Sequence, residues 1–88
     1  MVKMREGYDE AWLADLMRRF QSLNCPGTVA YTIGADLGLK AGAWTFAIVS
    51  DFVDVDAYRA YDDDELHNAL RAELMTQLEQ VARVQFEP

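Results

Sequence analysis

The chain has 88 residues, the length of one domain, and 51% of them are hydrophobic. Its 15 acidic and 8 basic residues give a formal net charge of -7. That sign is opposite to the one expected of a nucleic-acid-binding surface, and it also disfavours anionic membranes. We therefore expect neither nucleic acid nor a membrane as a partner.

The single cysteine, Cys25, has no partner for an internal disulfide and no second thiol for a metal cluster, which favours a reducing compartment. The first residues lack the basic and then apolar pattern of a signal peptide. No apolar run approaches the ~20 residues that a membrane span needs. These features predict a soluble cytoplasmic protein.

The first half of the chain predicts a strand, a helix and a second strand. Residues 1–5 are short and mixed, which suits a strand at the terminus. Asp9 is a suitable N-cap, and apolar residues then follow at helical spacing to Leu23. Residues 24–27 read NCPG and end this helix. Alternating apolar residues predict a strand over 28–33, and glycines mark a long hairpin connection over 35–43.

The second half predicts a buried strand, a broken helix and a final strand. Residues 44–53 read WTFAIVSDFV, a nearly continuous apolar run typical of a strand covered on both faces. Asp54 predicts the start of a short helix, which breaks near Asp62. The longer helix beyond it has leucines at four-residue steps, namely Leu66, Leu70, Leu74 and Leu78. Alternation predicts a last strand over residues 81–86.

This β-α-β-β-α-β order predicts an α+β, ferredoxin-like fold, in which a four-stranded antiparallel sheet carries its helices on one face. The strand over 44–53 has apolar residues on both of its faces, and the helices can cover only one face. A second copy packed sheet to sheet is the simplest cover, so we expect a homodimer through the open sheet face. No internal repeat is present, and residues 1–88 are expected to form a single domain.

The segment Asp56-Ala-Tyr-Arg-Ala-Tyr61, with His67 six positions later, resembles the stress-responsive A/B barrel (Dabb) family of dimeric α+β barrels. The opening strand, the glycine-bearing connection and the strand from Trp44 to Phe52 resemble it too. The resemblance covers essentially the whole chain. It implies a homodimer in which two sheets pack into one barrel.

One branch of that family includes a plant polyketide cyclase, which closes a poly-β-keto chain by intramolecular aldol condensation without a metal or organic cofactor. The resemblance implies that His67 and Tyr61 occupy the positions of its catalytic histidine and pocket tyrosine. A further histidine of that enzyme would precede Met1 here, and Phe46 stands at the place of another. Only part of the cyclase constellation is therefore present.

His67 could act as a general base, because imidazole titrates near pH ~6.5. Alternatively, it is a boundary histidine whose ring nitrogens bond nearby carbonyls or carboxylates. Tyr61 could orient a substrate carbonyl, or its ring could fill the core with the hydroxyl at the rim. The four acids from Asp62 to Glu65 fit helix capping better than a metal site, and with no second histidine we expect no metal. The resemblance to a cyclase that works without an organic cofactor implies that no cofactor is needed here.

Four residues could line an apolar ligand pocket between sheet and helices, or form ordinary core: Tyr31, Trp44, Phe46 and Ile48. Cys25 has no nearby base in the sequence, and we interpret it as a small buried thiol.

Three functions remain open from the sequence. The first is a homodimeric barrel that binds a small apolar or aromatic molecule between sheet and helices. The second is a cofactor-independent cyclase-like lyase with His67 as base and Tyr61 holding the carbonyl. The third is a stress-linked interaction module without catalysis. A monooxygenase on the same barrel rests only on analogy of fold.

Overall fold

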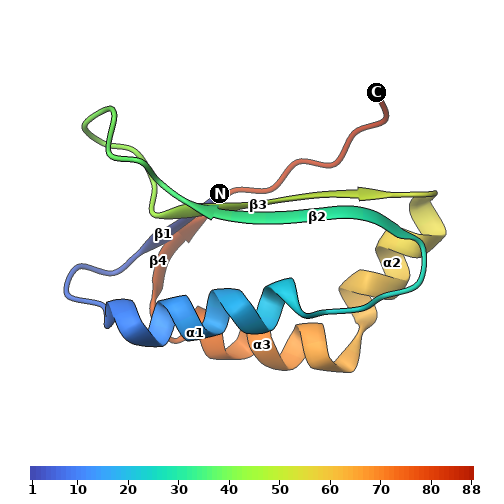
Figure 1. Cartoon of the computed structure of the whole chain (residues 1–88), viewed down its shortest axis with the longest axis horizontal. Coiled ribbons are helices and arrows are strands. Elements are labelled where there is room, and N and C mark those ends of the chain that lie inside the picture. Colours follow the sequence, from blue (N-terminus) through green and yellow to red (C-terminus); the bar gives the residue numbers. More distant parts are fainter.

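The computed structural model describes all residues from 1 to 88 and has an α+β fold. Its elements are β1 (Val2–Met4), α1 (Glu10–Gln21), β2 (Thr28–Ala35), β3 (Phe46–Phe52), α2 (Val55–Asp63), α3 (Glu65–Met75) and β4 (Leu78–Val81). The strands form one antiparallel sheet in the order β2-β3-β1-β4. Helices α1 and α3 lie against one face of this sheet, and no helix covers the other (Figure 1). The predicted ferredoxin-like arrangement is confirmed.

An aspartate side chain begins each helix. Asp9, Asp54 and Asp64 each accept a hydrogen bond from a backbone N–H of the first turn that follows. These bonds satisfy N–H groups that have no partner within the helix. The caps predicted at Asp9 and Asp54 are confirmed, and the helix break predicted near Asp62 falls at Asp64.

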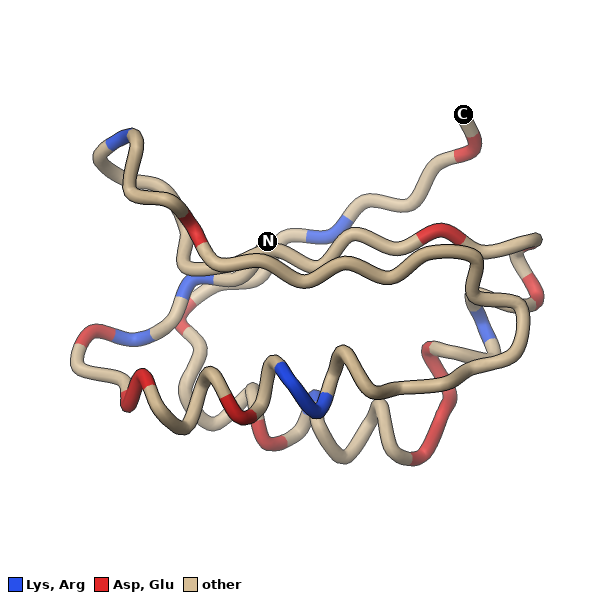
Figure 2. Tube along the Cα trace, in the orientation of Figure 1, with Lys and Arg blue, Asp and Glu red and all other residues tan.

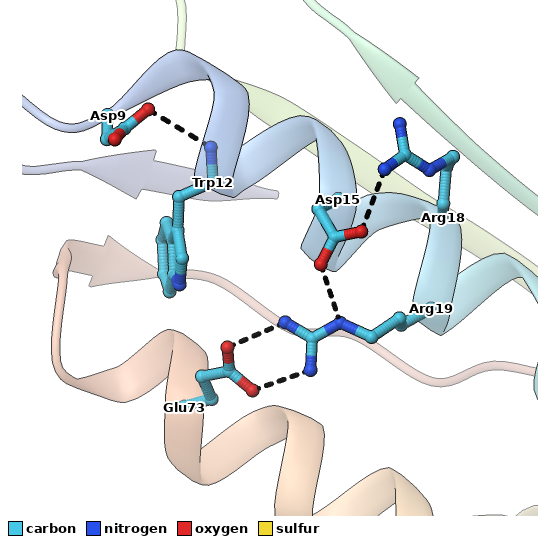
Figure 3. Close-up of polar contacts among 6 residues, drawn as sticks. All are labelled: Asp9, Trp12, Asp15, Arg18, Arg19 and Glu73. Carbon is cyan, nitrogen blue, oxygen red and sulfur yellow. Dashed lines mark hydrogen bonds and ion pairs between the residues drawn. The ribbon is translucent and has the colours of Figure 1, made fainter.

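The core lies between the sheet and helices α1 and α3. Its buried side chains come from both strands at the centre of the sheet and from both helices: Val2, Met4, Leu13, Leu16, Phe20, Phe46, Leu70 and Leu74. At the rim of this core the guanidinium of Arg19 on α1 donates two hydrogen bonds, of 2.8 and 2.6 Å, to the Glu73 carboxylate on α3 (Figure 3). Such a two-pronged pair fixes the relative position of the two helices.

The last strand lies earlier than predicted. β4 ends at Val81, and residues 82–88 form no strand, so the prediction over residues 81–86 was wrong. The reason is the length of its partner: β4 pairs with the three-residue β1, from Met4 opposite Leu78 to Val2 opposite Val81. Ala82 still exchanges two backbone hydrogen bonds with Met1, but the tail beyond it pairs with no strand, and Val84 and Phe86 are 79% and 78% exposed.

On β2 and β3 the uncovered face of the sheet carries mostly small residues. Thr32 pairs with Val49 and Gly34 pairs with Ala47 across β2 and β3. These residues alternate with Tyr31, Ile33 and Ile48, which pack against the core on the helix side. Val49 is 64% exposed, so the apolar surface of β3 that faces away from the helices is uncovered in the single chain.

Candidate functional site

The turn between α2 and α3 brings Tyr61 and His67 together. Tyr61 lies in the last turn of α2, and the Asp64 cap starts α3 by accepting a 2.9 Å hydrogen bond from the backbone N of His67. The chain reverses direction here, and the two rings stand 4.2 Å apart between centroids. Acidic residues gather at this turn (Figure 2), where Asp62 forms a 2.9 Å ion pair with Arg71. Asp64 therefore caps α3, as the capping interpretation of these acids predicted, and Asp62 links the turn to Arg71 of the same helix.

The His67 side chain is buried, with 6% of its surface exposed, and its Nδ1 has no hydrogen-bond partner. The edge of the ring meets Phe20, at 6.2 Å between centroids. Burial, together with the positive charge of Arg71, lowers the pKa of His67 below its usual value. A neutral imidazole with a free ring nitrogen is the form that can accept a proton.

The Tyr61 hydroxyl is paired with the hydroxyl of Tyr31 on β2, at 2.8 Å. The two rings meet edge to face, 5.7 Å apart between centroids. Burial raises the pKa of both Tyr31 and Tyr61, so both hydroxyls keep their protons at neutral pH. If Tyr31 donates to Tyr61, the proton of the Tyr61 hydroxyl is free for a carbonyl oxygen. Tyr31 thus joins the two residues that the resemblance pointed to.

We expect the single histidine to make stability depend on pH. The unfolded His67 binds a proton below pH ~6.5, whereas the folded side chain, with its lowered pKa, resists protonation. The unfolded state therefore binds more protons in this range, and the free energy of unfolding falls as the pH drops from ~6.5 toward the folded pKa. Above pH ~7 the imidazole is neutral in both states, and this contribution is constant.

The measurement is urea unfolding between pH 7.5 and 5.5, a range chosen around the ordinary histidine pKa of ~6.5. A His67→Phe variant keeps a ring of similar shape and should lose most of this slope. His67 is the only histidine in the chain, so no other imidazole can mask the result. An equal slope in parent and variant would contradict the buried neutral imidazole.

A separate cavity of about 430 Å³ lies between α1 and the ends of β2 and β3. Of the four residues predicted to line a ligand pocket, Trp44 and Phe46 line this cavity, and Tyr31 and Ile48 do not. The other lining residues are Tyr8, Glu10, Leu13, Ala14, Met17, Ala35, Asp36, Ala43 and Thr45. Neither Tyr61 nor His67 is among them. The structure thus separates the candidate residues into a tyrosine-histidine cluster and an aromatic cavity.

The sequence reasoning did not single out the cavity residues of α1. Leu13 and Met17 carried a signal, the apolar stripe of this helix, but that stripe also describes ordinary core. Cys25 is buried as expected, and burial raises the pKa of its thiol, which keeps it protonated. No three histidine, cysteine or acidic side chains lie together in a way that could hold a metal ion. No helix is both long and apolar enough to cross a membrane.

The sequence model of the stress responsive A/B barrel domain family, Dabb, matches residues 1–88. The chain belongs to the Dabb family. This agrees with the ferredoxin-like sheet and with the Tyr61 and His67 pattern from which the resemblance was inferred. No curated protein matches the Dabb chain significantly.

Two solved structures are similar to this Dabb chain. One is a dimeric ferredoxin-like protein of unknown function from Thermobifida fusca, with 27% identity and a TM-score of 0.81, covering 91% of this chain and 77% of that one. The other is a dimeric protein of unknown function with a ferredoxin-like fold from Bacteroides fragilis, with 20% identity and a TM-score of 0.70. It covers 90% of this chain and 82% of that one. The second likeness concerns the fold alone.

Proposed function

We propose that this Dabb protein is a homodimer that binds a small apolar or aromatic molecule between the sheet and α1. The observation that carries the proposal is the cavity lined by Trp44 and Phe46. Its volume of about 430 Å³ lies within the range of ~300–1,000 Å³ of ligand pockets. Its lining is mostly hydrophobic, with a few polar groups, as is usual for small-molecule sites.

The homodimer part of the proposal rests on the open sheet face. Val49 and its small neighbours form a surface that allows close approach of a second sheet, and both similar structures are described as dimeric. A closed two-fold dimer would cover this surface in both copies at once. Sedimentation at micromolar concentration should give twice the mass of the chain, and a particle of the single-chain mass would refute the dimer.

The ligand part can be tested with N-phenyl-1-naphthylamine, a neutral fluorophore whose emission rises in apolar sites. We expect saturable binding to the parent protein. Ala14 lines the cavity from α1, and an Ala14→Phe substitution puts a ring into that space. The added ring and the probe would compete for the same space, so we expect the affinity for the probe to fall about tenfold, which corresponds to ~1.4 kcal/mol.

The matched control for this test is Ala72→Phe. Ala72 is an exposed alanine of α3 that does not line the cavity, so the same added ring should leave probe binding unchanged. Equal affinities of the Ala14→Phe and Ala72→Phe variants, or no saturable binding to the parent, would argue against the cavity as the ligand site.

A second candidate function is a cyclase-like lyase without a cofactor, in which His67 removes a proton and Tyr61 holds the enolate oxygen. It is supported by the lowered pKa of His67, by the unpartnered Nδ1 and by the Tyr61 ring beside it. Turnover of a β-keto test substrate should then be lost in a His67→Ala variant, and equal rates would exclude His67 as the base. If the protein is a dimer that neither binds the probe nor turns over the substrate, the stress-linked interaction module is the function that remains.

A further inference from the structure

The charged side chains that line the cavity are all acidic. Glu10 and Asp36 both line it, and no lysine, arginine or histidine does. The carboxylate of Asp36 is held in place, because its Oδ2 accepts a 2.9 Å hydrogen bond from the backbone N of Gly38. The backbone N of Asp36 donates a 2.9 Å hydrogen bond to the carbonyl of Thr45, across the start of the hairpin connection. Its Oδ1 has no partner in the chain and is available to a ligand.

The aromatic side chains of the cavity also favour a positively charged ligand. Trp44 and Tyr8 are both half-buried and both line the space. The face of an aromatic ring attracts a cation, and tryptophan does so most strongly. The protein as a whole carries a net charge of -7, so its long-range field favours cationic over anionic molecules.

The buried side chains of the cavity lining form its apolar floor. Phe46 and Leu13 belong to the buried core cluster, and Met17 packs against it. A ligand that fits the whole cavity therefore has two unlike ends: an apolar body against this floor and a positive group at the carboxylates.

We propose that the ligand of this cavity is an amine with an aromatic or alkyl body, bound as the ammonium ion. Asp36 and Glu10 accept hydrogen bonds from the ammonium group, Trp44 and Tyr8 flank it, and Phe46, Leu13 and Met17 contact the body. This inference rests on the proposed binding function and specifies the class of ligand for the same site.

The experiment compares three molecules of nearly equal shape as competitors of N-phenyl-1-naphthylamine at pH 7: phenethylamine, 2-phenylethanol and 3-phenylpropionate. They carry a positive charge, no charge and a negative charge. We expect displacement in that order of strength. Exposed ion pairs contribute ~0.2–1 kcal/mol, so each carboxylate should change the affinity for the amine by about 1.4- to fivefold.

The variants are Asp36→Asn and Glu10→Gln, which keep the side-chain size and, at position 36, an oxygen that can accept from Gly38. Each should weaken phenethylamine and leave 2-phenylethanol unchanged. Asp63→Asn is the matched control, because Asp63 is exposed at the end of α2, outside the cavity lining, and the substitution changes the net charge equally.

The outcomes separate this inference from the proposed function. Equal displacement by all three molecules, or equal weakening of phenethylamine by Asp36→Asn and Asp63→Asn, would overturn the amine while leaving an apolar ligand site in place. If the parent protein binds neither the probe nor any competitor, the proposed binding function fails together with the amine.

Discussion

Replacing Leu16 by alanine is expected to lower the free energy of unfolding by about 2–5 kcal/mol, because the substitution removes buried methyl groups and leaves a cavity. Leu16 has 0% of its surface exposed and lies at the centre of the core between α1 and the sheet. Urea unfolding measures the loss. Parent and variant must be compared at one protein concentration, since the stability of a dimer depends on it.

The matched control is the same substitution at Leu66 on α3, which is 56% exposed. It should cost less than ~1 kcal/mol, because surface substitutions away from packed sites have small effects. This pair also tests which face of α3 meets the core. If Leu66→Ala proved as costly as Leu16→Ala, the leucine and not His67 would have to point inward.

Replacing Gly27 by alanine is expected to be destabilising for two separate reasons. Its φ angle is +84°, a backbone region that costs residues with a Cβ ~1–2 kcal/mol. An added Cβ would also lie 2.5 Å from the Cβ of Ala57 on α2, too close for two carbons. The carbonyl of Gly27 accepts a 2.9 Å hydrogen bond from Val53, so the turn cannot move away without loosening the end of β3.

Gly7 separates the two effects. Its φ angle is +81°, almost the same, but an added Cβ would meet nothing within 4 Å. Gly7→Ala should therefore show the backbone cost of ~1–2 kcal/mol alone, and Gly27→Ala a larger loss in the same urea titration. Equal losses would mean that α2 can shift away from the turn at little cost.

The sequence was sufficient to predict those helices and strands whose pattern lies within a few neighbouring residues. Asp9 followed by an apolar stripe predicts α1, because capping and helical spacing both act within a few residues. Alternation predicts β2, and the nearly continuous apolar run predicts β3, because both patterns lie within a few consecutive residues. The order of these elements then leads to the ferredoxin-like sheet.

The orientation of α3 is a case that sequence could not decide. The four-residue spacing of the leucines placed Leu66 in the apolar stripe of the helix. However, Leu66 lies four residues before Leu70 and His67 lies three residues before it, and a residue at either spacing can share the helix face of Leu70. Contacts with Tyr61 and Phe20 bring His67 inward instead. The choice depends on the neighbouring elements, which no spacing within α3 reveals.

By itself the sequence determined the order of the elements and the caps at Asp9 and Asp54, because these follow from short-range patterns, and the Dabb motif pointed to Tyr61 and His67 as candidate residues. Only the tertiary structure decided how the candidate residues divide. Tyr31 and Trp44 are both aromatic residues at the sheet, yet Tyr31 meets Tyr61 while Trp44 lies at the cavity beside α1. The register of β2 and β3 sets their separation: Tyr31 lies opposite Ser50, whereas Trp44 precedes Phe46, which lies opposite Ala35 at the other end of the hairpin. This register depends on how the long connection between the two strands folds, which the strand patterns alone do not reveal.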